Sequence, residues 1–376
     1  MRKKVLFVIE SLSGGGAEKV LTVLLKHIDK TRFDVTLCTV VEIGVYMDEV
    51  KKYVSCTSIL GNPNRKTFLG KIWYRFKYKC VYNWLPLKWV YRLFIPQGND
   101  VEIAFVEGFA TKLMAASSNK QAKKLAWVHT DLINNHWIES IYRNITEEQL
   151  SYQKYDQIIG VSKQVTNSVQ HLYHLKNVIT CYNPIESDVI LKWAGENLSL
   201  PLKKESLRLV SVGRFVPQKA FDRLLRVVNR LYKEGFSLEL WLLGDGEQRP
   251  LLEQYIRDEN LEGIVTLWGF QTNPYPYLQH SDLFVCSSVS EGYSTAVTEA
   301  LIIGLPVVTT ACSGMDELLD NGTYGAVTEN DEGALYEGVK RCFTQSDLLN
   351  TYKEQAIHYK DRVTLKQQMS HIEELF

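Results

Sequence analysis

The sequence predicts an α/β protein with two domains, each built on a parallel sheet flanked by helices. Short apolar runs typical of buried strands recur along the chain, and segments with the apolar spacing of helices lie between them. Length supports two domains, because 376 residues exceed one ordinary hydrophobic core and suit two domains of typical size.

The expected strands are short and alternate with the expected helices. In the first half of the chain they cover residues 5–9, 35–41, 101–106, 124–128, 157–161 and 178–181. In the second half they cover residues 207–212, 237–243, 265–268, 283–286 and 306–309. Helical spacing is clearest at residues 17–27, 220–234, 250–259 and 295–303.

A proline near the middle of the chain marks the expected domain boundary. Asn183-Pro184 stops regular structure, and a polar segment through residues 203–205 leads into the next strand. We therefore expect an N-terminal domain at 1–183 and a C-terminal domain at 184–355. Residues 356–376 are expected to form a charged terminal helix, and its packing against the N-terminal domain is left open.

Composition excludes several classes of protein. Apolar residues make up 45% and charged residues 23%, which is the balance of a folded protein rather than a disordered one. The seven cysteines are scattered without a Cys-x-x-Cys pair, which argues against a disulfide framework or a structural zinc site and favours a reducing compartment. No stretch reaches the roughly 18–20 consecutive apolar residues of a membrane-spanning helix, so we expect a soluble or peripheral protein.

Charge is unevenly distributed, although the net charge is zero. No acidic residue lies between Glu49 and Asp100, and within residues 65–95 basic and aromatic residues interleave. One interpretation is docking on an anionic membrane, because aromatic rings favour the interface and cations favour anionic lipid. The alternative is that the aromatics are domain core and the cations its solvated face. Nucleic acid is a weaker alternative, because no recognition motif accompanies the charge.

A glycine-rich turn follows the first expected strand. Gly14, Gly15 and Gly16 precede a helix, where backbone N–H groups are suited to contact an anion or a sugar. The run lacks the full Gly-x-Gly-x-x-Gly pattern. A tight turn that only glycine tolerates explains it equally well.

Two cations lie in the loop after the strand at 207–212. Arg214 and Lys219 stand just before a helix, and in open α/β sheets such loops border the ligand crevice. A planar guanidinium and a mobile ammonium together suit a diphosphate. The alternative is that both are solvated loop residues.

A Gly-Asp-Gly turn follows the next strand, at residues 244–246. Asp245 and Glu247 resemble a metal-binding carboxylate pair, but a turn that caps the following helix is the favoured interpretation.

Two glutamates flank the start of the helix at 295–303. Glu291 is expected in the entering loop and Glu299 about two turns inside the helix, with the N–H groups of residues 293–295 between them. Carboxylates accept hydrogen bonds from pairs of sugar hydroxyls. The alternative is that both are surface acids, but Glu299 lies among apolar residues, where an unpartnered charge would be costly.

In this order and spacing, these residues resemble glycosyltransferase family 4. The resemblance covers nearly the whole chain and is most specific in Arg214 with Lys219, in residues 244–246, and in the Glu-x7-Glu element of Glu291 and Glu299. It implies the GT-B fold, with two Rossmann-like domains whose parallel sheets face each other across a central cleft.

The resemblance also implies roles for individual residues. Arg214 and Lys219 would bind the donor diphosphate. Glu299 would bind the nucleotide ribose, and Glu291 would contact the hydroxyls of the transferred sugar. His129 matches a histidine that reaches the donor sugar. The implied catalytic residues are His129, Arg214, Lys219 and Glu291. The implied donor-binding residues are Gly15, Gly16, Arg214, Lys219, Gln271, Glu291, Gly292, Tyr293, Ser294, Thr295 and Glu299.

The implied activity is retaining transfer of a hexose or N-acetylhexosamine from a nucleotide diphosphate sugar, with UDP-sugars favoured, to a glycan acceptor. The acceptor would be polyprenyl-diphosphate-linked, and the setting would be bacterial capsule, exopolysaccharide or O-antigen synthesis on the inner face of the cell membrane. No Asp-x-Asp motif is present, so neither metal nor cofactor is expected. Two alternatives are kept, a GT-B nucleotide-sugar epimerase or hydrolase and a non-catalytic membrane-surface scaffold.

Overall fold

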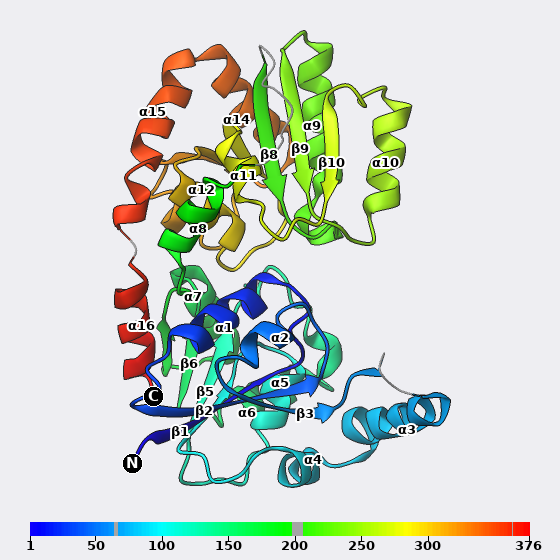
Figure 1. Ribbon diagram of the computed structural model, residues 1–376, viewed down its shortest axis with the longest axis vertical. Coiled ribbons are helices and arrows are strands. Elements are labelled where there is room, and N and C mark those ends of the chain that lie inside the picture. Colours follow the sequence, from blue (N-terminus) through cyan, green and yellow to red (C-terminus); the bar gives the residue numbers. More distant parts are fainter. Residues whose placement is uncertain (64–66, 198–205, 363) are drawn as a thin grey trace. The chain divides into compact units, whose positions relative to one another are not determined.

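The computed structural model describes residues 1–63, 67–197, 206–362 and 364–376. Residues 65–66 of the basic aromatic segment and residues 203–205 of the polar segment between the expected domains lie outside these ranges. The described chain divides into two compact units (Figure 1). Unit 1 comprises Met1–Ile185 with Lys366–Phe376, and unit 2 comprises Glu186–Leu365. Each unit contains one parallel sheet, so the expected α/β class with two parallel sheets is confirmed.

The sheet of unit 1 has seven strands in the order β3-β2-β1-β4-β5-β6-β7. Its interior strand β1 is buried from Val5 to Ile9, and Val5 pairs with Val35 on one side and Val101 on the other. Strand order reverses between β1 and β4, which is where open α/β sheets bind ligands. The strands are β1 (Lys3–Ile9), β2 (Phe33–Val41), β3 (Ser55–Leu60), β4 (Val101–Ala104), β5 (Lys123–Val128), β6 (Gln157–Gly160) and β7 (Val178–Thr180).

The helices of unit 1 include the last helix of the chain. Phe376, just after that helix, packs edge-on against Phe7 and Phe33 with ring centroids 5.7 Å apart in each pair. The end of the chain thereby contributes to the core of unit 1. The helices are α1 (Gly16–His27), α2 (Met47–Val50), α3 (Phe68–Lys79), the π-helical η2 (Cys80–Trp84), α4 (Leu87–Phe94), α5 (Phe109–Met114), the 3-10 turn η3 (Glu139–Ile141), α6 (Ile145–Tyr152), α7 (Lys163–Tyr173) and α16 (Leu365–Glu374).

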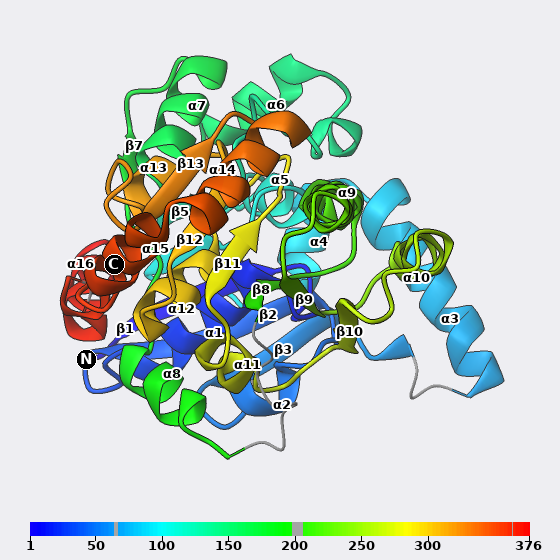
Figure 2. The ribbon, with the colours of Figure 1, turned by 90° about the horizontal axis from the view of Figure 1, so that it is seen from above.

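The sheet of unit 2 has six strands in the order β10-β9-β8-β11-β12-β13. Its order reverses between β8 and β11, and helices α9 and α14 pack beside each other against it (Figure 2). Leu224, Val228 and Leu231 form part of the buried apolar face of α9. The strands are β8 (Leu207–Val212), β9 (Leu238–Leu243), β10 (Val265–Gly269), β11 (Leu283–Cys286), β12 (Val307–Thr310) and β13 (Gly325–Thr328).

The helices of unit 2 alternate with these strands. They are α8 (Ser187–Ala194), the 3-10 turn η4 (Pro217–Lys219), α9 (Phe221–Lys233), α10 (Arg249–Asp258), α11 (Tyr275–Gln279), α12 (Thr295–Ile303), α13 (Met315–Leu318), α14 (Glu332–Thr344), α15 (Ser346–Ala356) and the 3-10 turn η5 (Tyr359–Asp361). Within the described residues of both units, none of the helices combines the length and the apolar character needed to cross a membrane.

Two strands were not predicted from the sequence. β3 is an edge strand in which Ser55, Thr57 and other small polar residues replace the apolar run of a buried strand. β13 is only four residues long and begins with Gly325, whose φ is +157°. A Cβ at residue 325 would lie 1.9 Å from the Val307 carbonyl oxygen, so this glycine allows the close approach of β12.

Candidate active site

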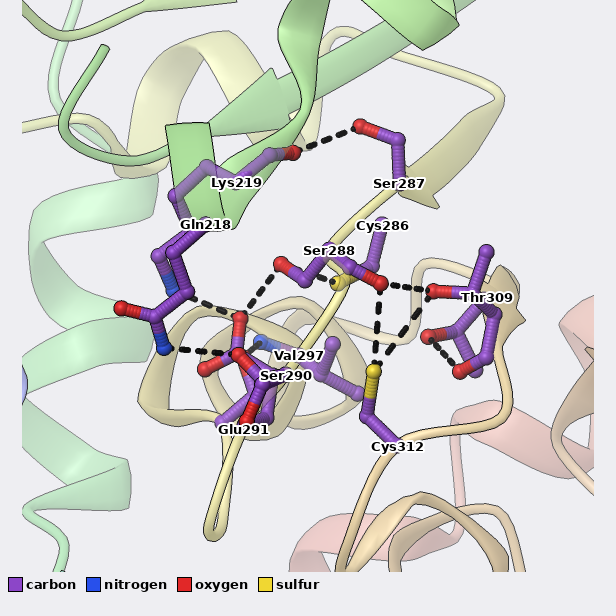
Figure 3. Close-up of polar contacts among 12 residues, drawn as sticks. Gln218, Lys219, Cys286, Ser287, Ser288, Ser290, Glu291, Val297, Thr309 and Cys312 are labelled. Carbon is purple, nitrogen blue, oxygen red and sulfur yellow. Dashed lines mark hydrogen bonds and ion pairs between the residues drawn. The ribbon is translucent and has the colours of Figure 1, made fainter. Parts of the chain in front are cut away.

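The loops after β8 and β11 meet where the strand order of unit 2 reverses. Lys219 Nζ lies 2.6 Å from Glu291 Oε1, and the Ser288 hydroxyl donates a hydrogen bond to the same oxygen at 2.6 Å (Figure 3). A small cavity is lined by all three side chains. The sequence-predicted cation and acid are therefore direct partners at the expected ligand crevice.

Further hydrogen bonds join the two loops along their backbones. The Gln218 side-chain amide donates to the Ser290 carbonyl at 2.7 Å, and the Val289 N–H donates to the Gln218 carbonyl at 2.8 Å. The Ser287 hydroxyl donates to the Lys219 carbonyl at 2.9 Å. Lys219 and Glu291 are thus held in position by backbone contacts as well as by their own ion pair.

The charges of this site are unevenly compensated. Burial opposes the charged form of Lys219, but the adjacent Glu291 carboxylate outweighs burial and raises the pKa of Lys219 above its ordinary value. Arg214 acts in the opposite direction on this pKa, which places the two cations within electrostatic reach of each other. The Arg214 side chain is exposed and makes no ion pair with any described residue. The site therefore has one paired and one uncompensated cation.

The Gly-Asp-Gly turn supports the loop that carries Arg214. A Cβ at Gly244 would lie 1.8 Å from the Gly213 carbonyl oxygen, and one at Gly246 would lie 2.5 Å from the Phe215 carbonyl oxygen. Only glycine permits this close packing. The predicted capping role is wrong, because α10 has Gln248 at its N-cap with no side-chain cap hydrogen bond. The turn shapes the neighbouring loop instead.

The second glutamate lies on α12. Ser294 is the N-cap of this helix, and its hydroxyl accepts a hydrogen bond from the Val297 N–H. The helix begins at Thr295 as expected, but at 3.6 residues per turn this start places Glu299 about one turn inside the helix, not two as predicted. Glu299 and Glu291 are 5% and 7% exposed, so the alternative that both are surface acids is wrong.

Two other predicted donor-binding side chains already have partners in unit 2. The Gln271 amide donates to the Trp268 carbonyl at 2.7 Å, within its own loop. The Tyr293 side chain hydrogen-bonds Tyr359. Both side chains therefore have a hydrogen-bond partner within unit 2.

Gly292 is buried in the loop before α12 of unit 2, and the remaining predicted residues belong to unit 1. Gly15 is the N-cap of α1 and Gly16 is its first residue. A Cβ at Gly15 would lie 2.3 Å from Glu18 Oε2, the end of a flexible side chain, so this contact alone does not require glycine here. His129 directly follows β5, and its backbone N–H donates to Glu107 Oε2 at 2.8 Å.

Sequence reasoning missed two polar residues at these sites. Ser288 holds the Glu291 carboxylate, and its carbonyl accepts hydrogen bonds from Thr310 and Cys312. Glu107 is 2% exposed and holds the backbone of His129. The available signal in both cases was position, since each residue follows a buried strand at the carboxyl edge of its sheet.

Known glycosyltransferases are similar to this chain in sequence. Residues 206–345 match the family model of glycosyl transferases group 1. The chain is 29% identical over 363 residues to N-acetylgalactosamine-N,N'-diacetylbacillosaminyl-diphospho-undecaprenol 4-alpha-N-acetylgalactosaminyltransferase of Campylobacter jejuni, covering 95% of this chain and 94% of that protein. It is 32% identical over 235 residues to an uncharacterized glycosyltransferase of Methanocaldococcus jannaschii, covering 60% of this chain and 57% of that protein. These matches support a glycosyltransferase family.

Solved structures establish the fold. Anabaena HepE in complex with UDP and glucose is 18% identical, with a TM-score of 0.76 over 99% of both chains. Sucrose-phosphate synthase of Thermosynechococcus elongatus is 15% identical, with a TM-score of 0.77 over 100% of this chain and 98% of that one. The expected GT-B fold, with its two Rossmann-like units, is thereby confirmed.

Proposed function

We propose that the protein is a retaining glycosyltransferase of family 4 that moves a hexose or N-acetylhexosamine from a UDP-sugar to a lipid-linked glycan. The observation that carries this proposal is the Lys219–Glu291 pair at the strand-order reversal of unit 2, beside uncompensated Arg214 and buried Glu299. These groups offer cations for a diphosphate and carboxylates for hydroxyls at one ligand crevice.

In the proposed reaction, the bond between the anomeric carbon and the donor diphosphate breaks, and the acceptor oxygen bonds to the same face of that carbon. The leaving diphosphate takes up the negative charge and receives the proton of the acceptor hydroxyl. Arg214, Lys219 and the N–H groups at the start of α12 stabilise this charge in the transition state. Metal is not needed for this role, because Arg214 and Lys219 supply the positive charge.

The ion pair between Lys219 and Glu291 also affects which ligand the site would bind. The Glu291 carboxylate is paired with Lys219, the cation that the proposed donor diphosphate would contact. Donor binding supplies both partners at once, since phosphate oxygens replace the carboxylate at Lys219 and sugar hydroxyls donate to Glu291. A bare nucleoside diphosphate satisfies only Lys219 and leaves the buried Glu291 without its cation. This coupling favours a complete nucleotide sugar over its hydrolysed product.

One relative and the surface of residues 67–95 support the proposed acceptor and location. The Campylobacter jejuni relative is named for a diphospho-undecaprenol acceptor. In the present chain, Trp73, Phe76 and Trp84 are 64%, 48% and 59% exposed, so the alternative that these rings are core does not apply to them. Arg75 and Lys79 beside them are exposed as well. Exposed rings among cations fit reversible docking on an anionic membrane, at its cytoplasmic face.

A donor assay tests the proposed function. Full-length protein is incubated with labelled UDP-sugars, with and without a bacterial membrane lipid extract, and UDP release and labelled lipid are both measured. A transferase gives labelled lipid and UDP release that depends on the extract. A hydrolase or epimerase turns over the donor without the extract, and a scaffold does not turn it over at all.

A further inference from the structure

Two residues of unit 1 are fixed to one buried carboxylate. The Trp137 indole N–H donates to Glu107 Oε1 at 3.2 Å, and the His129 backbone N–H donates to Glu107 Oε2 at 2.8 Å. Glu107 itself is 2% exposed. Since both oxygens of a single carboxylate are used, the Trp137 ring is held in a fixed relation to the backbone of His129.

The three residues lie at the carboxyl edge of the sheet. Glu107 follows β4 and His129 follows β5, and β4 borders the reversal of strand order in unit 1. Ligands of open α/β sheets bind outside the carboxyl ends of the strands at such a reversal. Trp137 lies in the segment between β5 and α6, so this segment carries an aromatic ring to the expected ligand position.

Trp137 combines exposure with immobility. The residue is 43% exposed, yet the single polar atom of its side chain is bonded to Glu107, so the exposed part of the ring is carbon. Gly108 makes room for it, because a Cβ there would lie 3.0 Å from Trp137 Cη2 and the φ of +107° disfavours any other residue. A ring that is already fixed loses little conformational freedom when a ligand stacks on it.

His129 adds an unsatisfied polar atom to this cluster. Its Nε2 is buried without a hydrogen-bond partner among the residues that the structure describes. Such atoms are rare in folded proteins and are expected at functional sites. The ring packs on Phe105 with centroids 5.0 Å apart, and its burial lowers the pKa of His129, which keeps the imidazole neutral at pH 7.

We infer that Trp137 is a stacking platform for a sugar ring and that Glu107 positions it beside His129. One face of a sugar ring is formed by C–H bonds and suits an aromatic ring, while its hydroxyls need polar partners nearby. This inference deepens the proposed glycosyltransferase function and rests on it. The sugar belongs either to the nucleotide-sugar donor or to the acceptor, and the experiment separates the two.

The direct test uses fluorine NMR of the full chain labelled with 5-fluorotryptophan. The chain has eight tryptophans, and the resonance missing from Trp137→Phe identifies Trp137. Methyl α-glycosides of glucose, galactose and their N-acetylated forms stand in for acceptor sugars, and UDP, UDP-glucose and UDP-N-acetylglucosamine test the donor. A shift of the Trp137 resonance with a sugar-bearing probe but not with UDP supports the inference. No shift with any of these probes overturns it.

A kinetic test separates stacking from folding. Trp137→Leu should raise the KM of the substrate whose sugar stacks by about tenfold, whereas Trp137→Phe, which keeps a ring, should recover much of the loss. Glu107→Gln should also raise this KM, because the ring is no longer held by a carboxylate. Trp193→Leu is the matched control, since Trp193 is an exposed tryptophan on α8 of unit 2, outside this cluster, the donor loops and the proposed membrane surface. Equal KM values in Trp137→Leu and wild type would overturn the inference.

Failure of this inference is distinguishable from failure of the proposed function. UDP binding, measured by thermal stabilisation of the same variants, reports only on the donor site. If UDP binds but the Trp137 resonance does not shift with any probe, the stacking inference is wrong and the proposed transferase function stands. If the Trp137 resonance shifts with methyl glycosides but UDP does not bind, the saccharide site stands and the proposed UDP-sugar donor is wrong.

Discussion

Lys219 Nζ lies 2.6 Å from Glu291 Oε1, so the cation assigned to the donor diphosphate is held by the acid assigned to the donor sugar. The ion pair spans the two loops at the strand-order reversal of unit 2. Glu291 is 7% exposed, and the pair compensates both charges. In the proposed function, this pair couples substrate recognition to charge stabilisation.

Replacing either cation should abolish most of the turnover. Arg214→Ala and Lys219→Ala should each lower kcat by about a hundredfold or more, because each removes a fixed charge from the leaving diphosphate. The measurement is UDP release with saturating donor and acceptor extract. Arg226→Ala is the control, since Arg226 is a partly exposed cation on α9 that pairs with Asp222 and Glu332. Near-normal turnover in both site variants would contradict the proposed role.

The two glutamates should separate into different functions. Glu299→Gln should weaken UDP affinity, because the carboxylate assigned to the ribose hydroxyls is lost. Glu291→Gln should leave UDP affinity equal or higher, since Lys219 is then free for phosphate, but it should lower sugar transfer. Calorimetric titration with UDP and the transfer assay measure the two effects. Unchanged UDP affinity in Glu299→Gln would exclude the ribose assignment.

Stability should depend on pH through His129. Burial holds the pKa of His129 below its ordinary value of 6.5, so the unfolded chain binds a proton more readily than the folded one as pH falls through 6.5. This group therefore favours folding above pH 6.5 and loses that contribution toward lower pH, by at most about 1.4 kcal/mol per pH unit. Thermal unfolding of wild type and His129→Asn between pH 5 and pH 8 checks this. The wild type should lose more stability on acidification, and parallel curves would contradict it.

Turnover should not require a divalent metal, because Arg214 and Lys219 supply the positive charge that metal supplies in other transferases. Activity in the presence of excess EDTA should equal activity without it. The control is a metal-dependent nucleotide-sugar transferase in the same buffer. Loss of activity with EDTA and its recovery with magnesium or manganese would refute the expectation.

Membrane binding should depend on the basic face of α3. Replacing Lys71, Arg75, Lys77 and Lys79 together by Gln should lower partitioning onto anionic vesicles by at least about tenfold, because each cation near such a surface contributes about 1 kcal/mol. Co-sedimentation with anionic and neutral vesicles measures the effect.

A matched control separates this surface from total charge. Lys52, Lys120, Lys154 and Lys176 are exposed lysines of the same unit outside residues 65–95. Their joint replacement by Gln changes the net charge equally and should leave vesicle binding nearly unchanged. Equal loss in the two variants would show that binding depends on overall charge, and equal binding by wild type and the α3 variant would exclude the docking surface.

Much of the fold was predictable because buried parallel strands are near-continuous apolar runs. β3 and β13 lacked that signal, since one is a polar edge strand and the other a short strand that begins with Gly325. In the candidate site, Arg214, Lys219, Glu291 and Glu299 were identified by position and spacing. The contacts of Ser288 with Glu291 and of Glu107 with Trp137 were not, because each depends on side-chain packing that local spacing does not encode.

The most direct test of the central claim is transfer of label from a UDP-sugar to lipid by wild-type protein and by Lys219→Ala. The proposal predicts that the wild type forms labelled lipid with an equal amount of UDP, that both depend on the lipid extract, and that Lys219→Ala loses both by about a hundredfold while remaining folded. UDP release by the wild type that is independent of extract, or equal lipid labelling by the two proteins, would contradict it.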